Sequence, residues 1–315
     1  MRKEPSIQAI ARKLCQGKYT LKDLDISRAF IRKMKDAGYR ILSEESKQGR
    51  QFYIQQSLQN PYFFVSGLSR NEQHVRWVEL SDIHAGSIQF DEQGLRDVLR
   101  QATDEGYKDV HISGDLCDGY KVYPGHIKNL RYWKAEEQAD MLTEVFLDFK
   151  LNYYAIHGNH DFSYVRDGSP NPISLIEKEM VREHRNFVYL NGMAGDLIIC
   201  GALKRLVHLD GGRVYAKSYP GQTYIRNLLD SHGENVWIAG KGYRIRFLQC
   251  GHFHTDVEFE SSGIYLTHPG NFQFPNEYTI RRGLVGYQGA RLTNAWIKDG
   301  RVRKFCSTFI KPRRH

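Results

Sequence analysis

Apolar and polar residues alternate at two different spacings along the chain, and the spacing changes near residue 74. Before that point, apolar side chains such as Ile7, Ile10 and Leu14 recur every three or four positions, which is typical of amphipathic helices. After it, short apolar runs of strand length alternate with longer helical stretches. This pattern predicts a small N-terminal domain (1–56), a linker (57–73) and a layered α/β body with several antiparallel strands (74–315).

The N-terminal domain is predicted to hold three short helices followed by a hairpin. A capping box at 20–23 opens the second helix, and Ser27 can cap the third, which Gly38 ends. Two short extended stretches, 39–42 and 51–54, predict a two-stranded wing.

This arrangement resembles a winged helix-turn-helix domain, with 27–37 as its recognition helix. The resemblance implies that six basic residues contact nucleic acid: Arg28, Arg32, Lys33, Lys35, Lys47 and Arg50. Domains of this kind also serve as dimerisation or protein-docking modules, so both roles remain open. In the linker, Tyr62–Val65 is too apolar for a free tether and is expected to pack on one of the domains.

Charge is distributed unevenly along the chain. The first 60 residues hold 13 Lys and Arg against 6 Asp and Glu, and the last 15 hold 6 Lys and Arg and no acid. Because the net charge of the whole chain is +9, the middle carries −4. Basic ends on a mildly acidic body indicate a polyanionic partner, with DNA favoured and RNA as an alternative.

Composition narrows the cellular setting. No run of eighteen apolar residues is present, so no membrane partner is expected, and the first residues lack the apolar core of a signal peptide. Five widely spaced cysteines without a CxxC motif favour free thiols in a reducing compartment. We therefore expect a cytoplasmic protein.

The body is predicted from alternating strand-like and helix-like segments. The expected strands are Val75–Leu80, Asp109–Ser113, Asn152–Ile156, Leu197–Cys200, Arg244–Gln249, 264–267, 290–297 and 302–309. The expected helices lie near 91–104, 126–149, 172–184 and 219–230.

Four of these strands are followed by polar clusters. The clusters are Asp82-Ile83-His84, Gly114-Asp115-Leu116-Cys117-Asp118, Gly158-Asn159-His160-Asp161 and Gly251-His252-Phe253-His254. Ligands bind at the carboxyl ends of strands in open α/β sheets, so we expect the four clusters to converge on one edge of one sheet. Carboxylate, imidazole and amide groups together favour manganese, iron or zinc over magnesium or calcium. A carboxylate such as Asp115 can bridge two cations.

The ordered series DxH, GDxxD, GNHD and GHxH resembles the calcineurin-like metallophosphoesterase superfamily, over about 240 residues from position 74. The family has a lone histidine between the last two motifs, a place that His208 fits better than His184 or His232. The resemblance implies a sandwich of mixed sheets flanked by helices, which binds two divalent metal ions. Manganese is the favoured metal, and iron, zinc and nickel are alternatives.

The resemblance also implies roles for individual residues. Metal one would be held by Asp82, His84 and His254, metal two by Asn159, His208 and His252, and Asp115 would bridge both. His160 would act beside the phosphate as general acid or charge stabiliser, with Asp161 orienting its ring and Asp118 outside the ligand set.

These motifs fix a reaction type and leave the substrate open. The favoured interpretation is a DNA-directed phosphodiesterase or nuclease, because basic ends flank the site. The alternative is a phosphoprotein phosphatase or small cyclic-nucleotide phosphodiesterase that uses its N-terminal domain for docking. A regulator with an inactive hydrolase body is a third, less favoured interpretation.

Overall fold

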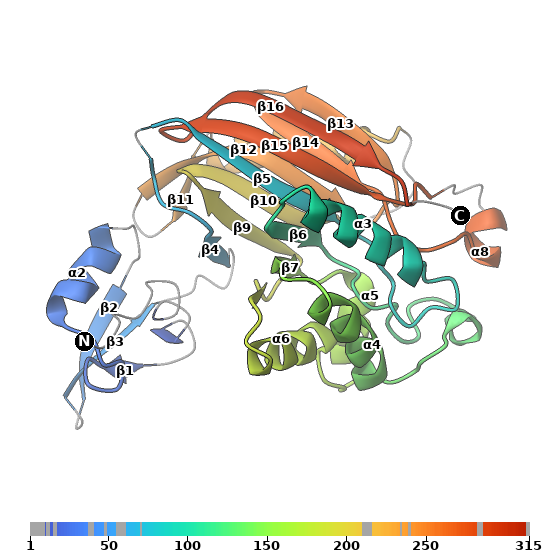
Figure 1. Cartoon of the computed structure of the whole chain (residues 1–315), viewed down its shortest axis with the longest axis horizontal. Coiled ribbons are helices and arrows are strands. Elements are labelled where there is room, and N and C mark those ends of the chain that lie inside the picture. The colour runs from blue at the N-terminus through green and yellow to red at the C-terminus, as the bar shows by residue number, and fades with distance from the viewer. Residues whose placement is uncertain are drawn as a thin grey trace.

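The computed structural model describes residues 10, 13–14, 18–36, 41–46, 49–54, 61–69, 71–209, 216–233, 235–238, 241–281 and 286–312. Within these residues, three β-sheets form (Figure 1). Two large sheets build the body, and the third, smaller sheet belongs to the N-terminal part.

The N-terminal sheet has the strand order β1-β3-β2 and lies beside helix α2. Their bounds are β1 Tyr19–Thr20, α2 Arg28–Asp36, β2 Ile41–Ser46 and β3 Gly49–Ile54. Ser27 caps α2, since its hydroxyl accepts a hydrogen bond from the Phe30 backbone amide at 3.2 Å. The expected hydrogen bonds between Thr20 and Asp23 also form, but they close a turn in place of the predicted second helix. The winged-helix assignment and the domain boundaries remain predictions.

The first large sheet is mixed, with the strand order β16-β15-β5-β6-β7-β8. Its strands are β5 Gln73–Leu80, β6 Asp109–Ser113, β7 Asn152–Ile156, β8 Phe187–Tyr189, β15 Ala290–Lys298 and β16 Arg301–Ile310. β5 to β8 run parallel to one another, whereas β15 is antiparallel to both β5 and β16.

The second large sheet is also mixed, with the order β13-β14-β12-β10-β9-β4 and β11 paired to β12. Its strands are β4 Tyr62–Phe64, β9 Ala194–Ile199, β10 Ala202–His208, β11 Asn235–Ile238, β12 Lys241–Gly251, β13 Asp256–Ser261 and β14 Ile264–Pro269. β4 comes from the predicted linker and pairs in parallel with β9, so this apolar stretch packs on the body as expected.

Helices cover the sheets on their outer faces. The helices of the body are α3 Glu92–Asp104, the 3₁₀ helix η1 His126–Asn129, α4 Ala135–Leu147, α5 Asn159–Arg166, α6 Pro172–Arg182, α7 Tyr219–His232 and α8 Glu277–Arg281. The single helix predicted over 126–149 is wrong, because the chain leaves helical geometry between η1 and α4. There the Arg131 amide donates to the Gly86 carbonyl at 2.8 Å, which ties this stretch to the loop after β5.

Side chains on β5 alternate between two cores. Trp77 packs between the two large sheets with Phe247, whereas Val78 and Leu80 face the helices α3 and α4. A third apolar cluster covers the other face of the second sheet and includes Leu248 on β12, together with residues of α7 and α2. The body is therefore a sandwich of two mixed sheets flanked by helices, and the predicted α/β fold class is confirmed.

Two further features of the described residues concern membrane spans and thiols. No helix among them combines the length and apolar character needed to cross a bilayer. The cysteines that they include, namely Cys117, Cys200, Cys250 and Cys306, are all free thiols.

Candidate metal centre

The polar loops that follow β5, β6 and β7 lie side by side at the carboxyl ends of these parallel strands. The Asp82 amide donates to the Gly114 carbonyl, and the His84 amide donates to the Asp115 carbonyl, both at 3.0 Å. The loop after β12 comes from the second sheet, so the expectation that all four clusters share one sheet is wrong. It joins the others because the His252 amide donates to the Asp82 carboxylate at 3.0 Å.

A first group of potential ligand atoms is formed by Asp82, His84 and His254, all within 4.8 Å of one another. The Nε2 atoms of the two histidines lie 3.0 Å apart, and His254 Nε2 lies 3.6 Å from Asp82 Oδ1. Burial, and next to it His84, lower the pKa of His254 well below its usual value, so its ring is neutral and offers a lone pair.

A second group is formed by Asp115, His208 and His252, again within 4.8 Å of one another. Asn159 joins it, since its Oδ1 lies 3.1 Å from both His208 Nε2 and His252 Nδ1. The same Asp115 Oδ2 lies 3.1 Å from His208 Nε2 and 4.0 Å from His84 Nε2. Asp115 therefore stands between the two groups, and His208 is the histidine of β10 that reaches the second group.

The backbone is strained where these side chains converge. Five of the seven residues have left-handed φ angles, which side-chain-bearing residues rarely adopt: Asp82, His84, Asp115, His252 and His254, with φ between 51° and 93°. The turn between His252 and His254 sends the first ring to the second group and the other ring to the first group. Strain of this kind persists only where surrounding structure enforces it, and it clusters at functional sites.

Outer partners hold two of the imidazoles with Nε2 toward the centre. His84 Nδ1 donates to Asp118 Oδ1 at 2.9 Å, and His208 Nδ1 donates to the Ser113 carbonyl at 2.8 Å. Such contacts fix the tautomer of a metal-binding histidine and raise its basicity. Asp118 is also one of a further group of potential ligand atoms, with His126 and His160, so its place outside the ligand set remains a prediction.

His160 borders both groups without belonging to the predicted ligand set. Its backbone amide donates to Asp115 Oδ1 at 2.9 Å, and its Nδ1 donates to the Asp118 carbonyl at 2.6 Å. Burial acts against protonation of the ring, but Asp115 and Asp118 raise the pKa of His160 to about 10. Its ring centre lies 4.5 Å from that of His84.

The expectation that Asp161 orients His160 is wrong. The Asp161 carboxylate accepts hydrogen bonds from the backbone amides of Leu116, Cys117 and Gly158 at 2.8 to 3.2 Å. It therefore shapes the two loops, and the group that orients the His160 ring is Asp118. Asp161 lies in the first turn of α5, and this position directs its side chain back onto the backbone that precedes the helix.

The donor set fits divalent cations. Burial raises the pKa of Asp82 to about 6; His208 opposes this rise and Asp115 adds to it. The nearby histidines therefore do not fully balance the negative charge of the two buried carboxylates. Burial, and next to it Asp161, raise the pKa of the Cys117 thiol well above its usual value, so no thiolate competes. Oxygen and nitrogen donors without thiolate match the preferences of first-row divalent ions. Burial acts against protonation of His208, but Asp115 raises its pKa to about 9, so a cation that bound there would displace a proton from the ring.

Sequence reasoning did not single out His126, which was one of several scattered histidines. Its Nε2 donates to Asp118 Oδ2 at 3.2 Å, and its Nδ1 accepts from the Val122 amide at 3.3 Å. Asp118 therefore contacts three histidines at once, and no sequence motif marks this third contact. Asn271, on the loop after β14, donates to the His254 carbonyl at 3.4 Å.

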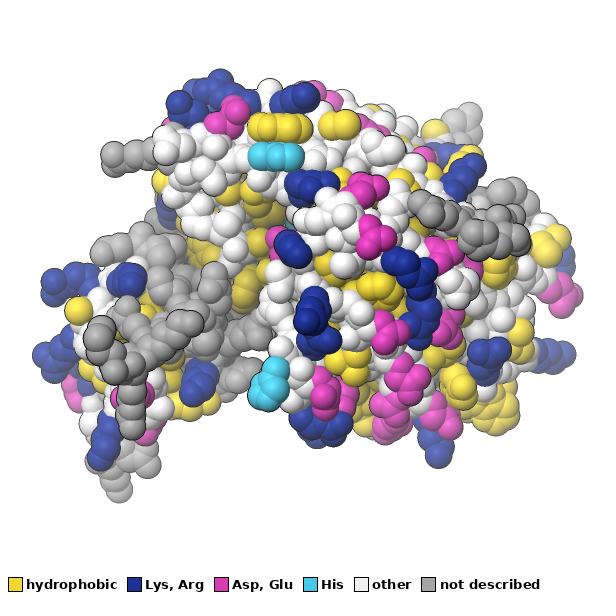
Figure 2. Space-filling model, viewed as in Figure 1, with side chains coloured by type: hydrophobic (Ala, Val, Ile, Leu, Met, Phe, Trp, Pro, Cys, Tyr) yellow, Lys and Arg dark blue, Asp and Glu magenta, His cyan; other side chains and the backbone are white. Residues whose placement is uncertain are grey.

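The residues expected to contact nucleic acid belong to the N-terminal part. Arg28, Arg32 and Lys33 are exposed on α2. Arg50 forms an exposed ion pair with Glu45 at 2.7 Å on the hairpin. The Lys35 side chain and Lys47 lie outside the described residues. Figure 2 shows dark-blue basic side chains around this part of the molecule.

Comparison with protein-family models finds no match. The chain is similar to the DNA polymerase II small subunit of Thermoplasma acidophilum, with 30% identity over 303 residues, which cover 82% of this chain and 60% of that protein. It is similar to the DNA polymerase II small subunit of Methanocaldococcus jannaschii, with 28% identity over 272 residues, which cover 76% of this chain and 45% of that protein.

Among solved structures, the chain is similar to an archaeal phosphodiesterase with a TM-score of 0.42 and 12% identity, over 75% of this chain and 100% of that one. Of the two curated relatives named above, the chain spans 60% of the length of the Thermoplasma protein and 45% of the length of the Methanocaldococcus protein.

Proposed function

We propose that the chain is a phosphoesterase that uses two divalent cations to hydrolyse phosphodiester bonds of DNA. The observation that carries this proposal is the position of Asp115 between two groups of nitrogen and oxygen donors. We assign Asp82, His84 and His254 to one cation, Asn159, His208 and His252 to the other, and Asp115 to both. Manganese is the favoured metal, with iron, zinc and nickel as alternatives.

When bound, such a cation pair supplies an acidified water as nucleophile and neutralises charge on the phosphoryl oxygens. The residues of the chain position the ester and manage its proton. The His160 Nδ1 is occupied by the Asp118 carbonyl, so its Nε2 is the atom that can face a phosphoryl or leaving oxygen. In its protonated form, His160 would donate a hydrogen bond there and stabilise the developing charge.

DNA is the favoured substrate for two reasons. Both ends of the chain are basic, and a polyanion is attracted by such ends. The curated relatives carry the name DNA polymerase II small subunit. The N-terminal domain, with Arg28, Arg32 and Lys33 exposed, would then contact DNA as a winged helix. Free thiols fit a cytoplasmic setting.

A panel of substrates tests the reaction class. The full chain is incubated with Mn²⁺ and, separately, bis(p-nitrophenyl) phosphate, single- and double-stranded DNA, RNA, a cyclic nucleotide and a phosphopeptide. We expect Mn²⁺-dependent cleavage of DNA. Turnover confined to the phosphopeptide or the cyclic nucleotide would replace the proposed substrate with the alternative class.

Two variants test the assignment of residues. Asp115→Ala should lose both bound manganese and turnover, because it removes the carboxylate shared by the two groups. His160→Ala should keep its manganese and lose turnover by roughly 10² to 10⁴-fold, as general acids contribute. Asp104→Ala, at the exposed end of α3, serves as a control with the same loss of a carboxylate. Undiminished activity of a metal-free Asp115→Ala protein would refute the assignment.

A further inference from the structure

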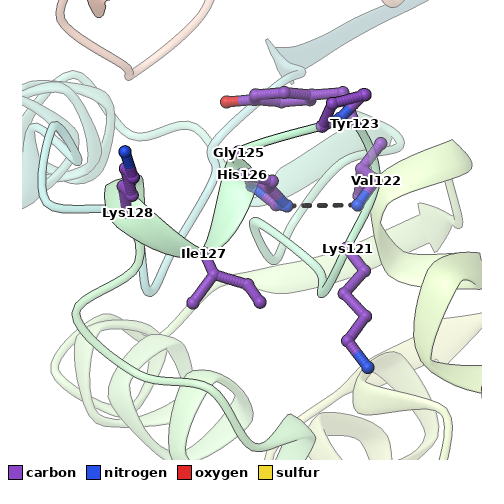
Figure 3. A pocket seen from close by; sticks show the side chains of 8 residues that line it. Lys121, Val122, Tyr123, Gly125, His126, Ile127 and Lys128 are labelled. Atoms are coloured by element: carbon purple, nitrogen blue, oxygen red, sulfur yellow. Dashed lines mark hydrogen bonds between the residues drawn. The ribbon is translucent and has the colours of Figure 1, made fainter.

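The segment 119–134, between β6 and α4, borders the candidate metal centre and has no role in the chemistry proposed above. Its middle part, 121–128, lines a surface pocket of about 710 Å³ (Figure 3). The Tyr123 ring lies 6.4 Å from the His160 ring, and the His126 ring lies 5.5 Å from it. Anything that rests on this segment is therefore adjacent to the residue placed beside the scissile phosphate.

Backbone hydrogen bonds hold the segment against the loop that carries His84. The Ile88 amide donates to the Asn129 carbonyl, and the Arg131 amide donates to the Gly86 carbonyl, both at 2.8 Å. The contact of His126 with Asp118 adds a buried anchor on the other side. The segment thus presents its outer side chains at a fixed place relative to the centre.

The segment is the opposite of the body in charge. It contains no Asp or Glu and four basic residues, whereas the chain outside its two basic ends carries a net charge of −4. The four are Lys121, Lys128, Arg131 and Lys134, and all of them are exposed. Among the described residues, none of these four forms an ion pair with a carboxylate. Lys121 lies over the Tyr120 ring, with Nζ 4.6 Å from the ring centre. Several exposed cations without a carboxylate partner suit a ligand with repeated negative charges.

Aromatic rings alternate with these cations. Tyr120, Tyr123, Tyr132 and Trp133 all fall within the segment, and Trp133 is 57% exposed. The Tyr123 hydroxyl accepts a hydrogen bond from Asn129 at 3.0 Å, and its ring lies 4.5 Å from that of His126, so the ring is held in place. Figure 3 shows Tyr123 and Lys128 on one side of the loop, with Lys121 pointing to the other side.

We propose that segment 119–134 binds single-stranded DNA and leads its phosphodiester backbone to the candidate metal centre. This inference rests on the proposed function. The cations contact successive phosphates, and bases stack on Tyr123 and Trp133, which is how sequence-tolerant single-strand binding works. Unpaired bases are required, because the bases of a duplex are already stacked on one another and cannot reach an exposed ring.

Binding of a labelled oligonucleotide tests the charges. The full chain is titrated into 5′-fluorescein-labelled (dT)12 without added metal, and anisotropy is followed at several salt concentrations. Lys128→Ala/Arg131→Ala should bind roughly tenfold more weakly. The slope of log K against log salt should flatten by about 1.4, since each phosphate contact on a single strand contributes about 0.7.

A matched control removes two lysines elsewhere in the same body. Lys108 and Lys150 are exposed and precede β6 and β7, so they lie at the strand ends opposite to the candidate centre. Lys108→Ala/Lys150→Ala changes the net charge equally and should leave affinity within twofold of the unaltered chain. Equal weakening in both double variants would overturn the proposal, because the effect would then be one of net charge alone.

Photo-crosslinking shows where the DNA strand contacts the chain. It therefore distinguishes binding by this segment from binding by the basic N-terminal domain. The full chain is irradiated with (dT)12 in which one position is 5-iododeoxyuridine, and the adducts are mapped by mass spectrometry. Adducts on Tyr123 or Trp133 are expected. Tyr123→Leu should weaken binding by roughly tenfold, whereas Tyr123→Phe should keep the affinity, because it retains the ring. Adducts confined to residues 1–56 would overturn the proposal.

The two proposals fail on different measurements. Absence of Mn²⁺-dependent hydrolysis of every ester in the panel, bis(p-nitrophenyl) phosphate included, would remove the proposed function. The binding and crosslinking results need no turnover, so they decide the role of segment 119–134 in either case.

Discussion

A buried ion pair between the two large sheets offers a quantitative test of how the sandwich is held together. Lys204 on β10 and Glu79 on β5 place Nζ and Oε1 2.6 Å apart, with side chains 0% and 2% exposed. Trp77 Nε1 also donates to Glu79 Oε1 at 2.7 Å, and the ammonium group lies 4.6 Å from the centre of the Trp77 ring. Lys204→Met keeps the side-chain volume and removes the charge, which leaves the Glu79 carboxylate buried without its cation.

The expected loss follows from the geometry. At 2.6 Å and an effective dielectric constant of about 20, the gross attraction is about 6 kcal/mol. Part of this attraction offsets the cost of burying two charges, and removing one partner from a buried pair costs about 3–5 kcal/mol. We expect Lys204→Met to lower the free energy of unfolding by this amount. In Glu79→Gln/Lys204→Met the buried charge is gone and the Trp77 hydrogen bond can persist, so the loss should be smaller by at least about 2 kcal/mol.

The loss should depend on pH in a defined direction. In the unaltered chain, burial opposes ionisation of Glu79, but Lys204 holds its pKa below the usual value, so this stabilisation is present above the unfolded-state pKa and fades in acid. In Lys204→Met the carboxyl pKa rises, so the folded variant loses stability as pH increases through that raised pKa. The first effect acts only below the unfolded-state pKa of a glutamate, about 4.3. The second effect therefore makes the difference between the two proteins smaller at pH 5 than at pH 7.5. This window lies below the pKa of Lys204, which burial lowers to about 8 against the pull of Glu79.

Urea unfolding followed by circular dichroism, with EDTA in every sample, measures these differences. Arg100→Met is the control, since it breaks the exposed Arg100–Asp97 pair and should cost less than about 1 kcal/mol. A loss below about 1 kcal/mol for Lys204→Met, or an equal loss in the double variant, would refute the reasoning.

Two further perturbations probe the sheets and the centre. His111 is fully buried against the rings of Trp77 and Tyr154, and burial, with Lys204 next, lowers its pKa well below the usual value. The unfolded chain therefore binds an extra proton below about pH 6.5, and stability falls as pH falls there. His111→Phe should flatten the dependence of unfolding free energy on pH by up to about 1.4 kcal/mol per unit between pH 4.5 and 6; an unchanged slope would contradict this. In Gly158→Ala, the added Cβ would lie 2.0 Å from Asp115 Oδ1 and 2.6 Å from the Asp115 backbone nitrogen, so bound manganese, measured by elemental analysis, should fall at least tenfold. Gly67→Ala, whose Cβ meets nothing within 4 Å, is the control, and full manganese binding by Gly158→Ala would count against Asp115 as the shared ligand.

Much of the body could be predicted from sequence because its parallel strands are buried on both faces and read as short apolar runs. The predicted strands Asp109–Ser113 and Asn152–Ile156 coincide with β6 and β7. β10 escaped prediction because Lys204 and Arg205 interrupt its apolar run, although both are buried and paired to carboxylates. A local pattern cannot show that a charge has a partner on another strand.

The candidate centre could be predicted at the level of residue types and less well in its geometry. The four motifs named six of the seven residues, and the resemblance to the metallophosphoesterases supplied the seventh, His208. They misassigned the partner of His160, because hydrogen bonding of Asp161 to three backbone amides depends on how two loops meet. Likewise, His126 carries no motif, and only the packing of η1 against Asp118 brings it to the centre.

The division of the centre between two sheets has a consequence for how the protein matures during its synthesis. Asp82, Asp115 and Asn159 follow strands of the first sheet. In the second sheet, His208 is the last residue of β10, and His252 and His254 follow β12. The ribosome must therefore have made the chain as far as His254 before the last imidazole can join the first carboxylate. A nascent or truncated polypeptide that ends before His252 lacks two of these imidazoles, so the candidate centre is complete only once strands of both sheets have been made.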